Sequence, residues 1–149
     1  MQRLLILSFI FLFILNYGVS QDFLHDFDTA IQKSKDENKT MMMVFSGSDW
    51  CKPCIQLKKT ILSSETFTAY SQDKLILLEL DFPYKKKNQL DKEQLKHNEA
   101  LADKYNKEGA FPKLILLNSE KQVIGQAEYR KNMTADQMIQ QIDPLLQKG

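Results

Sequence analysis

The sequence predicts an α/β fold of three layers, α/β/α, in which helices cover both faces of a central mixed sheet. Two apolar runs, at 41–45 and 75–78, have the unbroken hydrophobicity of strands that are buried on both faces. Segments of helical periodicity alternate with them, and two short runs at 113–117 and 122–126 are typical of a hairpin. The 149 residues, 43% of them apolar, suffice for one compact domain.

A leading helix is expected first, with Asp22 as its N-cap and its end near Asn38. Four apolar side chains share its inner face: Phe23, Phe27, Ala30 and Ile31. The strand Thr40–Ser46 follows. Next come a helix over Cys51–Ser63, whose inward residues are expected to be Ile55, Ile61 and Leu62, a shorter helical piece at Glu65–Ser71, and the strand Lys74–Phe82.

The segment Tyr84–Glu108 begins with three lysines at 85–87, which favour a solvated loop over a docking patch because acidic residues follow them. From Leu90 the pattern is helical, and Gly109 is expected to end this helix at its C′ position. Its inward side chains are predicted to be Leu95, Leu101, Ala102 and Tyr105. After the hairpin, Thr134 caps a last helix, which Pro144 should kink or end.

Charge does not select a partner, since 20 basic residues stand against 19 acidic ones. This balance gives no reason to expect nucleic acid or an anionic surface as a partner. The two histidines, His25 and His97, lie among polar residues and are interpreted as solvated surface residues.

Residues 1–20 have the features of a secretion signal. Arg3 supplies a positive end, Leu4–Leu15 is apolar apart from Ser8, and Gly18-Val19-Ser20 offers small residues for cleavage. The mature domain would then be residues 21–149, exported to a periplasmic or extracellular location. The alternative is an uncleaved membrane anchor, although the run is shorter than the ~20 apolar residues that span a bilayer.

The only two cysteines, Cys51 and Cys54, stand in a C-x-x-C spacing between an apolar strand and a helix. Free N–H groups and the positive dipole end at a helix start stabilise a thiolate on Cys51, which is the form that attacks a disulfide. Cys54, one turn later, is placed to resolve the mixed disulfide. Pro53 fits the first turn, and the positive charge of Lys52 should favour the thiolate; the alternative for Lys52 is an ordinary surface charge. Lys52 and Pro53 are thus predicted to tune the pair.

Three other uses of this spacing are open. A zinc site needs a second ligand pair, and His25 and His97 are isolated. Haem attachment needs a histidine after the second cysteine, where this chain has Ile55. An inert structural disulfide would close only a small loop and stabilise weakly. In the redox hypothesis the two sulfurs carry the electrons, so we expect no cofactor and no metal.

The run Trp50-Cys51-Lys52-Pro53-Cys54 after a strand resembles the active-site turn of the thioredoxin superfamily, and Phe111-Pro112 resembles its cis-proline loop. The resemblance extends over about 22–147 and is greatest to secreted bacterial thioredoxin-like proteins. It implies a thioredoxin-like fold with a helical insertion before the cis-proline. It also implies that Pro112 packs against the disulfide, and that Trp50, Phe111 and Pro112 frame a groove for an extended substrate.

The chain departs from this family at two positions. Thioredoxins carry a buried aspartate six residues before the first cysteine, where this chain has Phe45. Asp49, Asp81 or water would have to assist proton transfer instead. The usual glycine between the cysteines is replaced by Lys52.

The expected function is therefore that of an exported thiol–disulfide oxidoreductase, with reduction as the expected direction. Its expected partners are protein thiols and disulfides, together with a membrane-bound electron donor. Oxidation and isomerisation use the same two sulfurs, so residue types alone leave the direction open. The competing hypothesis is a non-catalytic binding module with a structural disulfide, which would hold a partner at Phe111 or at the lysines of the insertion.

Overall fold

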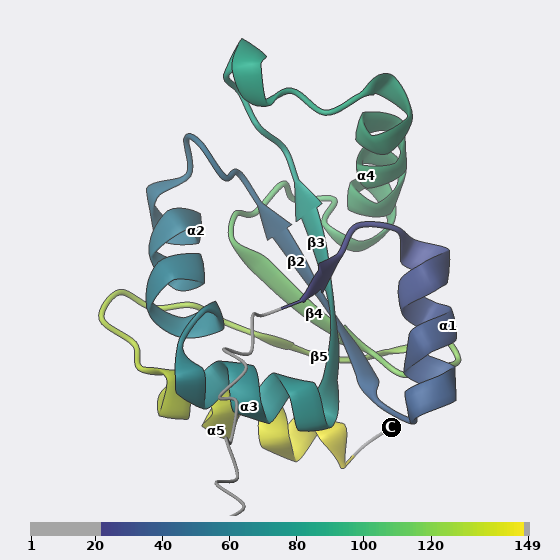
Figure 1. Ribbon diagram of the computed structural model, residues 1–149, viewed down its shortest axis with the longest axis vertical. Coiled ribbons are helices and arrows are strands. Elements are labelled where there is room, and N and C mark those ends of the chain that lie inside the picture. Colours follow the sequence, from purple (N-terminus) through teal and green to yellow (C-terminus); the bar gives the residue numbers. More distant parts are fainter. Residues whose placement is uncertain (1–21, 148–149) are drawn as a thin grey trace, which may run out of the picture.

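The computed structural model describes residues 22–147, which form three layers with a five-stranded sheet in the middle (Figure 1). The strands lie in the order β1-β3-β2-β4-β5. They span Phe23–Leu24 (β1), Thr40–Ser46 (β2), Leu75–Asp81 (β3), Lys113–Leu117 (β4) and Val123–Ala127 (β5). β1, β2 and β3 are parallel, whereas β4 is antiparallel to both β2 and β5. The predicted mixed sheet is confirmed, while the predicted signal peptide lies outside the described residues.

Helices cover both faces of this sheet, as the sequence predicts (Figure 1). They span Phe27–Glu37 (α1), Lys52–Leu57 (α2), Glu65–Lys74 (α3), Lys92–Tyr105 (α4) and Ala135–Leu146 (α5), with a π-helical turn at Lys58–Leu62 (η1) and a 3-10 turn at Lys86–Asn88 (η2). α1 and α4 lie on one face; α2, η1, α3 and α5 lie on the other. Among residues 22–147, no helix is both long enough and apolar enough to span a bilayer.

Alternation along β2 explains its unbroken apolar run. Met42 and Val44 belong to the core beneath α2 and α5, whereas Met41, Met43 and Phe45 belong to the core beneath α1 and α4. Successive strand residues point to opposite faces, and both faces are covered here, so every residue from Met41 to Phe45 is buried.

The beginning of the domain differs from the prediction of a helix capped by Asp22. Phe23–Leu24 is a short edge strand that pairs in parallel with Leu77 and Leu78 of β3. Asp26 caps α1 instead, its carboxylate accepting the Thr29 N–H at 2.8 Å. A strand of two residues is too short to show the alternation that identifies a strand. Because Phe23 also fits the helical spacing of the apolar residues that follow it, the sequence predicted a helix from Asp22 onward.

The helix that begins after Cys51 is also shorter than predicted. α2 ends at Leu57 and continues as the π-helical turn η1, whose wider turn shifts the residues that face the core. Leu57 is buried, and Ile55, predicted to face inward, is 41% exposed. Ile61 and Leu62 are buried as predicted.

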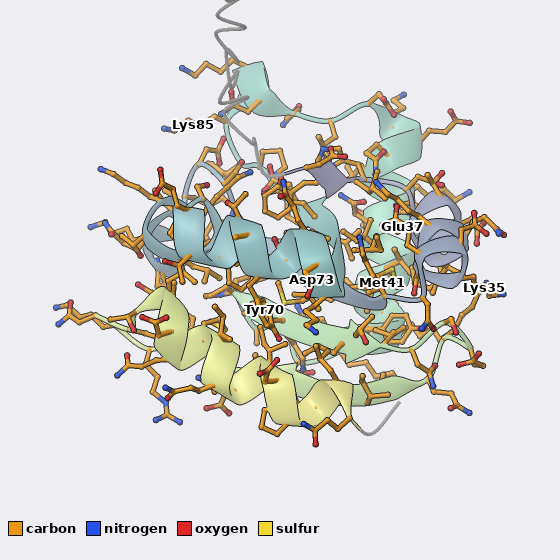
Figure 2. All side chains as sticks on the ribbon, turned by 60° about the horizontal axis from the view of Figure 1, so that its bottom comes forward. Lys35, Glu37, Met41, Tyr70, Asp73 and Lys85 are labelled. Atoms are coloured by element: carbon orange, nitrogen blue, oxygen red, sulfur yellow. A yellow bond between two sulfur atoms is a disulfide. The ribbon has the colours of Figure 1, made fainter. Side chains whose placement is uncertain are left out.

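α3 extends past the predicted Ser71 to Lys74 and lies beside α5. The Tyr70 hydroxyl donates to the Asp143 carboxylate of α5 at 2.9 Å, and Figure 2 shows Tyr70 between these two helices. Thr134 caps α5, as predicted, and it does so in a capping box with Gln137; the helix continues through Pro144 to Leu146.

The helix α4, which precedes Pro112 in the chain, is capped by Asp91 and ends at Tyr105. Three of its predicted inward residues, Leu101, Ala102 and Tyr105, pack against the core, whereas Leu95 is exposed. The buried residue of this helix is Asn98, one turn after Leu95, and its side-chain amide donates to the Asp81 carbonyl at 2.9 Å. Gly109 has a positive φ of 64°, but it lies in the turn after the helix and not at its C′ position.

The interpretation of the histidines as surface residues holds for His25, which is exposed, and is wrong for His97. The His97 ring is half-buried, and its Nε2 accepts the Phe27 N–H at 3.1 Å. It thereby joins α4 to the first turn of α1.

Candidate functional site

The turn before α2 is closed by a backbone hydrogen bond from the Cys51 N–H to the Gly47 carbonyl at 2.9 Å. The indole of Trp50 folds back onto this turn. A Cβ at Gly47 would lie 2.3 Å from Trp50 Cε2, so a larger residue could not occupy this position without moving the indole. The indole Nε1–H donates to the Phe82 carbonyl at 2.7 Å, which ties the turn to the end of β3.

Cys51 and Cys54 are joined by a disulfide at the N-terminus of α2. Cys51 is the N-cap residue, and its Sγ accepts the Cys54 N–H at 3.3 Å. Pro53 lies in the first turn as predicted. The two cysteines are only 5% and 2% exposed, so a reacting molecule must approach the small accessible part of Cys51. In the reduced form, an N–H aimed at Cys51 Sγ would favour its thiolate.

The bond between Phe111 and Pro112 is cis, which confirms that part of the prediction. The Phe111 ring meets the Trp50 ring edge to face, with centroids 5.5 Å apart, and meets the Phe82 ring in the same way at 5.5 Å. Trp50 is 48% exposed. The fold therefore brings Trp50 and Phe111, two of the predicted groove residues, into contact beside the disulfide turn, with Pro112 adjoining.

Asp49 and Asp81, the predicted substitutes for the missing buried aspartate, both hold loops together. The Asp81 carboxylate accepts hydrogen bonds from the backbone N–H and the hydroxyl of Ser48. The Asp49 carboxylate accepts the N–H groups of Tyr84 and Lys85 at 2.8 and 3.0 Å. Each carboxylate thus joins the turn before α2 to the chain at or just after the end of β3.

Desolvation raises the pKa of Asp49, but hydrogen bonds from Tyr84, Asn88 and Lys85 outweigh it and hold the pKa below its usual value. A carboxyl with a lowered pKa is a weaker proton acceptor. The side-chain N–H of Asn88 also donates to the Asp49 carboxylate, at 2.8 Å, which extends the same network into η2. Asp49 therefore acts as the anchor of the segment 84–88.

Phe45 faces the core beneath α1 and α4, on the side of the sheet away from α2. Its neighbour Val44 faces the α2 side and stands opposite Glu79 of β3. Glu79 is a carboxylate only 7% exposed, and both of its oxygens accept from the Lys58 ammonium, at 2.7 and 2.9 Å. Sequence reasoning missed this pair, although a single acid inside the apolar run 75–80 was a usable signal.

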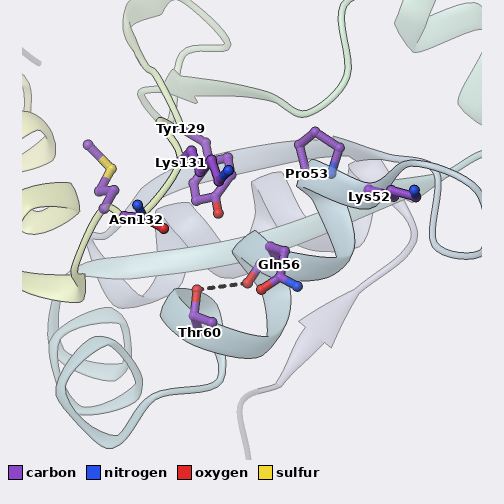
Figure 3. A pocket seen from close by; sticks show the side chains of 8 residues that line it. Lys52, Pro53, Gln56, Thr60, Tyr129, Lys131 and Asn132 are labelled. Atoms are coloured by element: carbon purple, nitrogen blue, oxygen red, sulfur yellow. Dashed lines mark hydrogen bonds between the residues drawn. The ribbon is translucent and has the colours of Figure 1, made fainter.

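A cavity of about 670 Å³ adjoins the disulfide turn (Figure 3). One wall comes from α2 and η1, and the other from the loop between β5 and α5. Its lining residues are Lys52, Pro53, Gln56, Thr60, Tyr129, Lys131, Asn132 and Met133. The predicted tuning residues Lys52 and Pro53 are therefore part of a larger surface that involves a loop far along the chain.

Within residues 22–147, no group of three or more His, Cys, Asp or Glu side chains is arranged to hold a metal ion. The cysteines form a disulfide with each other, while His97 Nε2 accepts a hydrogen bond from the first backbone N–H of α1. The zinc alternative therefore lacks a ligand set in this part of the chain.

A family model described as thioredoxin-like matches residues 22–119, a range that includes both cysteines and the cis-proline. Among characterised proteins, the disulfide bond reductase DsbH of Chlamydia pneumoniae is 36% identical over 91 residues, which are 61% of this chain and 53% of that protein. The thioredoxin-related protein DsbJ of the same organism is 34% identical over 99 residues, 66% of this chain and 28% of DsbJ. The matched part is thus about half of the first relative and less of the second.

A solved structure described as DsbH oxidoreductase is similar over most of the chain. It superposes with a TM-score of 0.77 at 27% sequence identity, and the match covers 86% of this chain and 85% of the other.

Proposed function

We propose that this chain, which belongs to the thioredoxin-like family, is a thiol–disulfide oxidoreductase that acts as a reductase on exported protein substrates. The observation that carries the proposal is the disulfide at the N-cap of α2, with Cys51 Sγ facing the Cys54 N–H. A purely structural disulfide would have no need of this helix-terminal position. The similarity to a protein named disulfide bond reductase supports the direction.

In the proposed reaction, the Cys51 thiolate attacks one sulfur of a substrate disulfide. A bond forms between Cys51 and that sulfur, and the other substrate sulfur leaves as a thiolate and takes up a proton. The Cys54 thiolate then attacks Cys51 Sγ, closes the intramolecular disulfide and releases the second substrate thiol. Two electrons pass to the substrate, and a thiol donor must return them to the Cys51–Cys54 pair.

The surrounding residues have supporting roles in this proposal. Lys52 and Pro53 tune the pair, Pro53 by fitting the first helical turn and Lys52 by its charge. Trp50, Phe111 and Pro112 frame the groove, where the backbone before Pro112 pairs with an extended substrate. The edge-to-face contact of Trp50 and Phe111 supports this placement.

The cellular setting belongs to the same proposal. Residues 1–20 serve as a signal peptide, and residues 21–149 form the exported domain in a periplasmic or extracellular location. Disulfides persist in such compartments. Electrons then have to come from outside the cytosolic thiol pool, and a membrane-bound donor is the source that we propose. Neither nucleic acid nor metal has a part in this scheme.

The test is insulin reduction by dithiothreitol in the presence of the purified protein. Wild type should accelerate it, and Cys51→Ser should lose the acceleration. Cys54→Ser should accumulate a mixed disulfide with substrate, visible on a non-reducing gel and released by reductant. Full activity in Cys51→Ser would show that the mechanism is wrong.

The reduction potential of the pair tests the direction. A value near −270 mV, about that of thioredoxin, would support a reductase, while a value between about −180 and −120 mV would mean oxidation or isomerisation. A pair that is still oxidised below about −300 mV would favour the binding-module hypothesis.

A further inference from the structure

The cavity beside the disulfide has a strongly one-sided charge. Lys52 and Lys131 line it, and none of its eight lining residues is acidic. Within residues 22–147, neither of these ammonium groups forms an ion pair, and both residues are exposed. Two unpaired cations at one concave surface attract a negatively charged ligand.

The rest of the lining suits a polypeptide. Tyr129 and Met133 contribute half-buried apolar surface, whereas Gln56 and Asn132 contribute side-chain amides that can donate hydrogen bonds. Figure 3 shows Gln56 and Tyr129 on facing walls. The volume of about 670 Å³ lies within the usual range of ligand clefts, about 300–1,000 Å³, and is large enough for several side chains.

The position of the cavity identifies its occupant. Lys52 and Pro53 line it and also stand between the two cysteines, so a chain whose cystine reaches Cys51 would continue into it. We propose that the cavity binds a short acidic segment of the protein substrate, adjacent to the cysteine that is exchanged. This inference rests on the proposed oxidoreductase function and adds a substrate class to it: disulfides flanked by Asp or Glu.

Lys131 offers the cleanest test because it lies outside the redox turn. The matched control is Arg130, the preceding residue, which is also exposed, does not line the cavity and pairs with Glu128 at 3.9 Å. Lys131→Gln and Arg130→Gln each remove one positive charge from the same loop. Only the first removes it from the cavity.

The substrates are two peptides that carry the same mixed disulfide to a coloured thiol, with either three glutamates or three glutamines beside the cysteine. Each is made with the triplet before or after the cysteine. With dithiothreitol as the electron donor and its uncatalysed rate subtracted, wild type should reduce the better-placed glutamate peptide with a kcat/KM about fivefold above that of its glutamine twin at low salt, and added salt should lower this ratio. Lys131→Gln should lower the ratio to about twofold, whereas Arg130→Gln should keep the wild-type ratio.

Equal rates for both peptides, or a loss of preference in Arg130→Gln alone, would overturn the proposal. Binding of the same peptides with serine in place of cysteine, measured by calorimetry, separates this inference from the proposed function. If neither disulfide peptide is reduced but the acidic serine peptide binds and depends on Lys131, the cavity assignment holds and the oxidoreductase function fails. If that peptide does not bind in a Lys131-dependent manner and its cystine form shows no preference, the cavity assignment fails.

Discussion

The Lys58→Met substitution removes the ammonium that faces Glu79 while it keeps most of the side-chain length. Glu79 lies on β3, opposite Val44 of β2, on the face of the sheet that α2 and η1 cover. Its carboxylate accepts two hydrogen bonds from Lys58. In the variant, an acid that is 7% exposed loses both of them.

The expected cost follows from burial. Removing one partner of a fully buried ion pair costs about 3–5 kcal/mol, because the other charge is left unpaired. Lys58 is at the edge of the core, with a side chain that is 44% exposed, so water can approach the carboxylate once the ammonium is gone. We therefore expect a loss of about 1–2 kcal/mol in the free energy of unfolding, equivalent to a fall in Tm of about 3–8 °C.

The measurement is urea unfolding of the oxidised protein, followed by far-UV circular dichroism. Lys59→Met is the matched control, since Lys59 is the next residue, is exposed and forms no ion pair within the described part of the chain. Glu79→Gln and the double variant complete a cycle. The double variant should be more stable than the sum of the single losses predicts, by about 1 kcal/mol.

The reasoning would be refuted if Lys58→Met were as stable as Lys59→Met with an unchanged m-value. It would also fail if the losses of Lys58→Met and Glu79→Gln simply added, because two groups that depend on each other cannot contribute independently.

Two further predictions concern Trp50 and Tyr70. Gly47→Ala should displace the indole of Trp50, because the added Cβ would lie 2.3 Å from it; since Trp50 is the only tryptophan, a red shift of the emission maximum reports the movement, and an unchanged spectrum would contradict it. Burial, followed by the hydrogen bond to the Asp143 carboxylate and its charge, raises the pKa of Tyr70 above its usual value of 10. The folded state then holds this proton more tightly than the unfolded state, so the resulting stability is present below about pH 10 and is lost as the pH rises further. Between about pH 9 and about pH 11, wild type should lose more of its urea midpoint than Tyr70→Phe, and equal losses would show that Tyr70 titrates normally.

Local pattern was enough for the parts of the site that are close in sequence. The C-x-x-C spacing at the start of a helix predicts the proximity of Cys51 and Cys54, because one helical turn joins them whatever surrounds it. Pro53 in the first turn follows from the same local geometry. The unbroken apolar runs at 41–45 and 75–78 predicted central strands correctly, since burial on both faces is a property of each strand alone.

Predictions from spacing along the chain were wrong where a residue's position depended on which face of the sheet it occupies or on a partner distant in sequence. Phe45 holds the matching position by count, but its side chain points away from α2, and the buried acid on the α2 side is Glu79. The strand β1 exists because the edge of β3 is open to Phe23–Leu24. Its two residues carry no pattern of their own, so local spacing predicted a helix there.

The sequence by itself determined the fold class, the proximity of Cys51 and Cys54 and the identity of the cis-proline region, because each is expressed in residues that are adjacent or periodic. Only the tertiary structure decided what surrounds them. The contact of Trp50 with Phe111, the use of Asp49 as an anchor for 84–88, and the cavity that joins Lys52 to Lys131 all depend on loops brought together by the sheet. Such contacts between distant residues have no period and no fixed spacing, and they exist only once the core has packed.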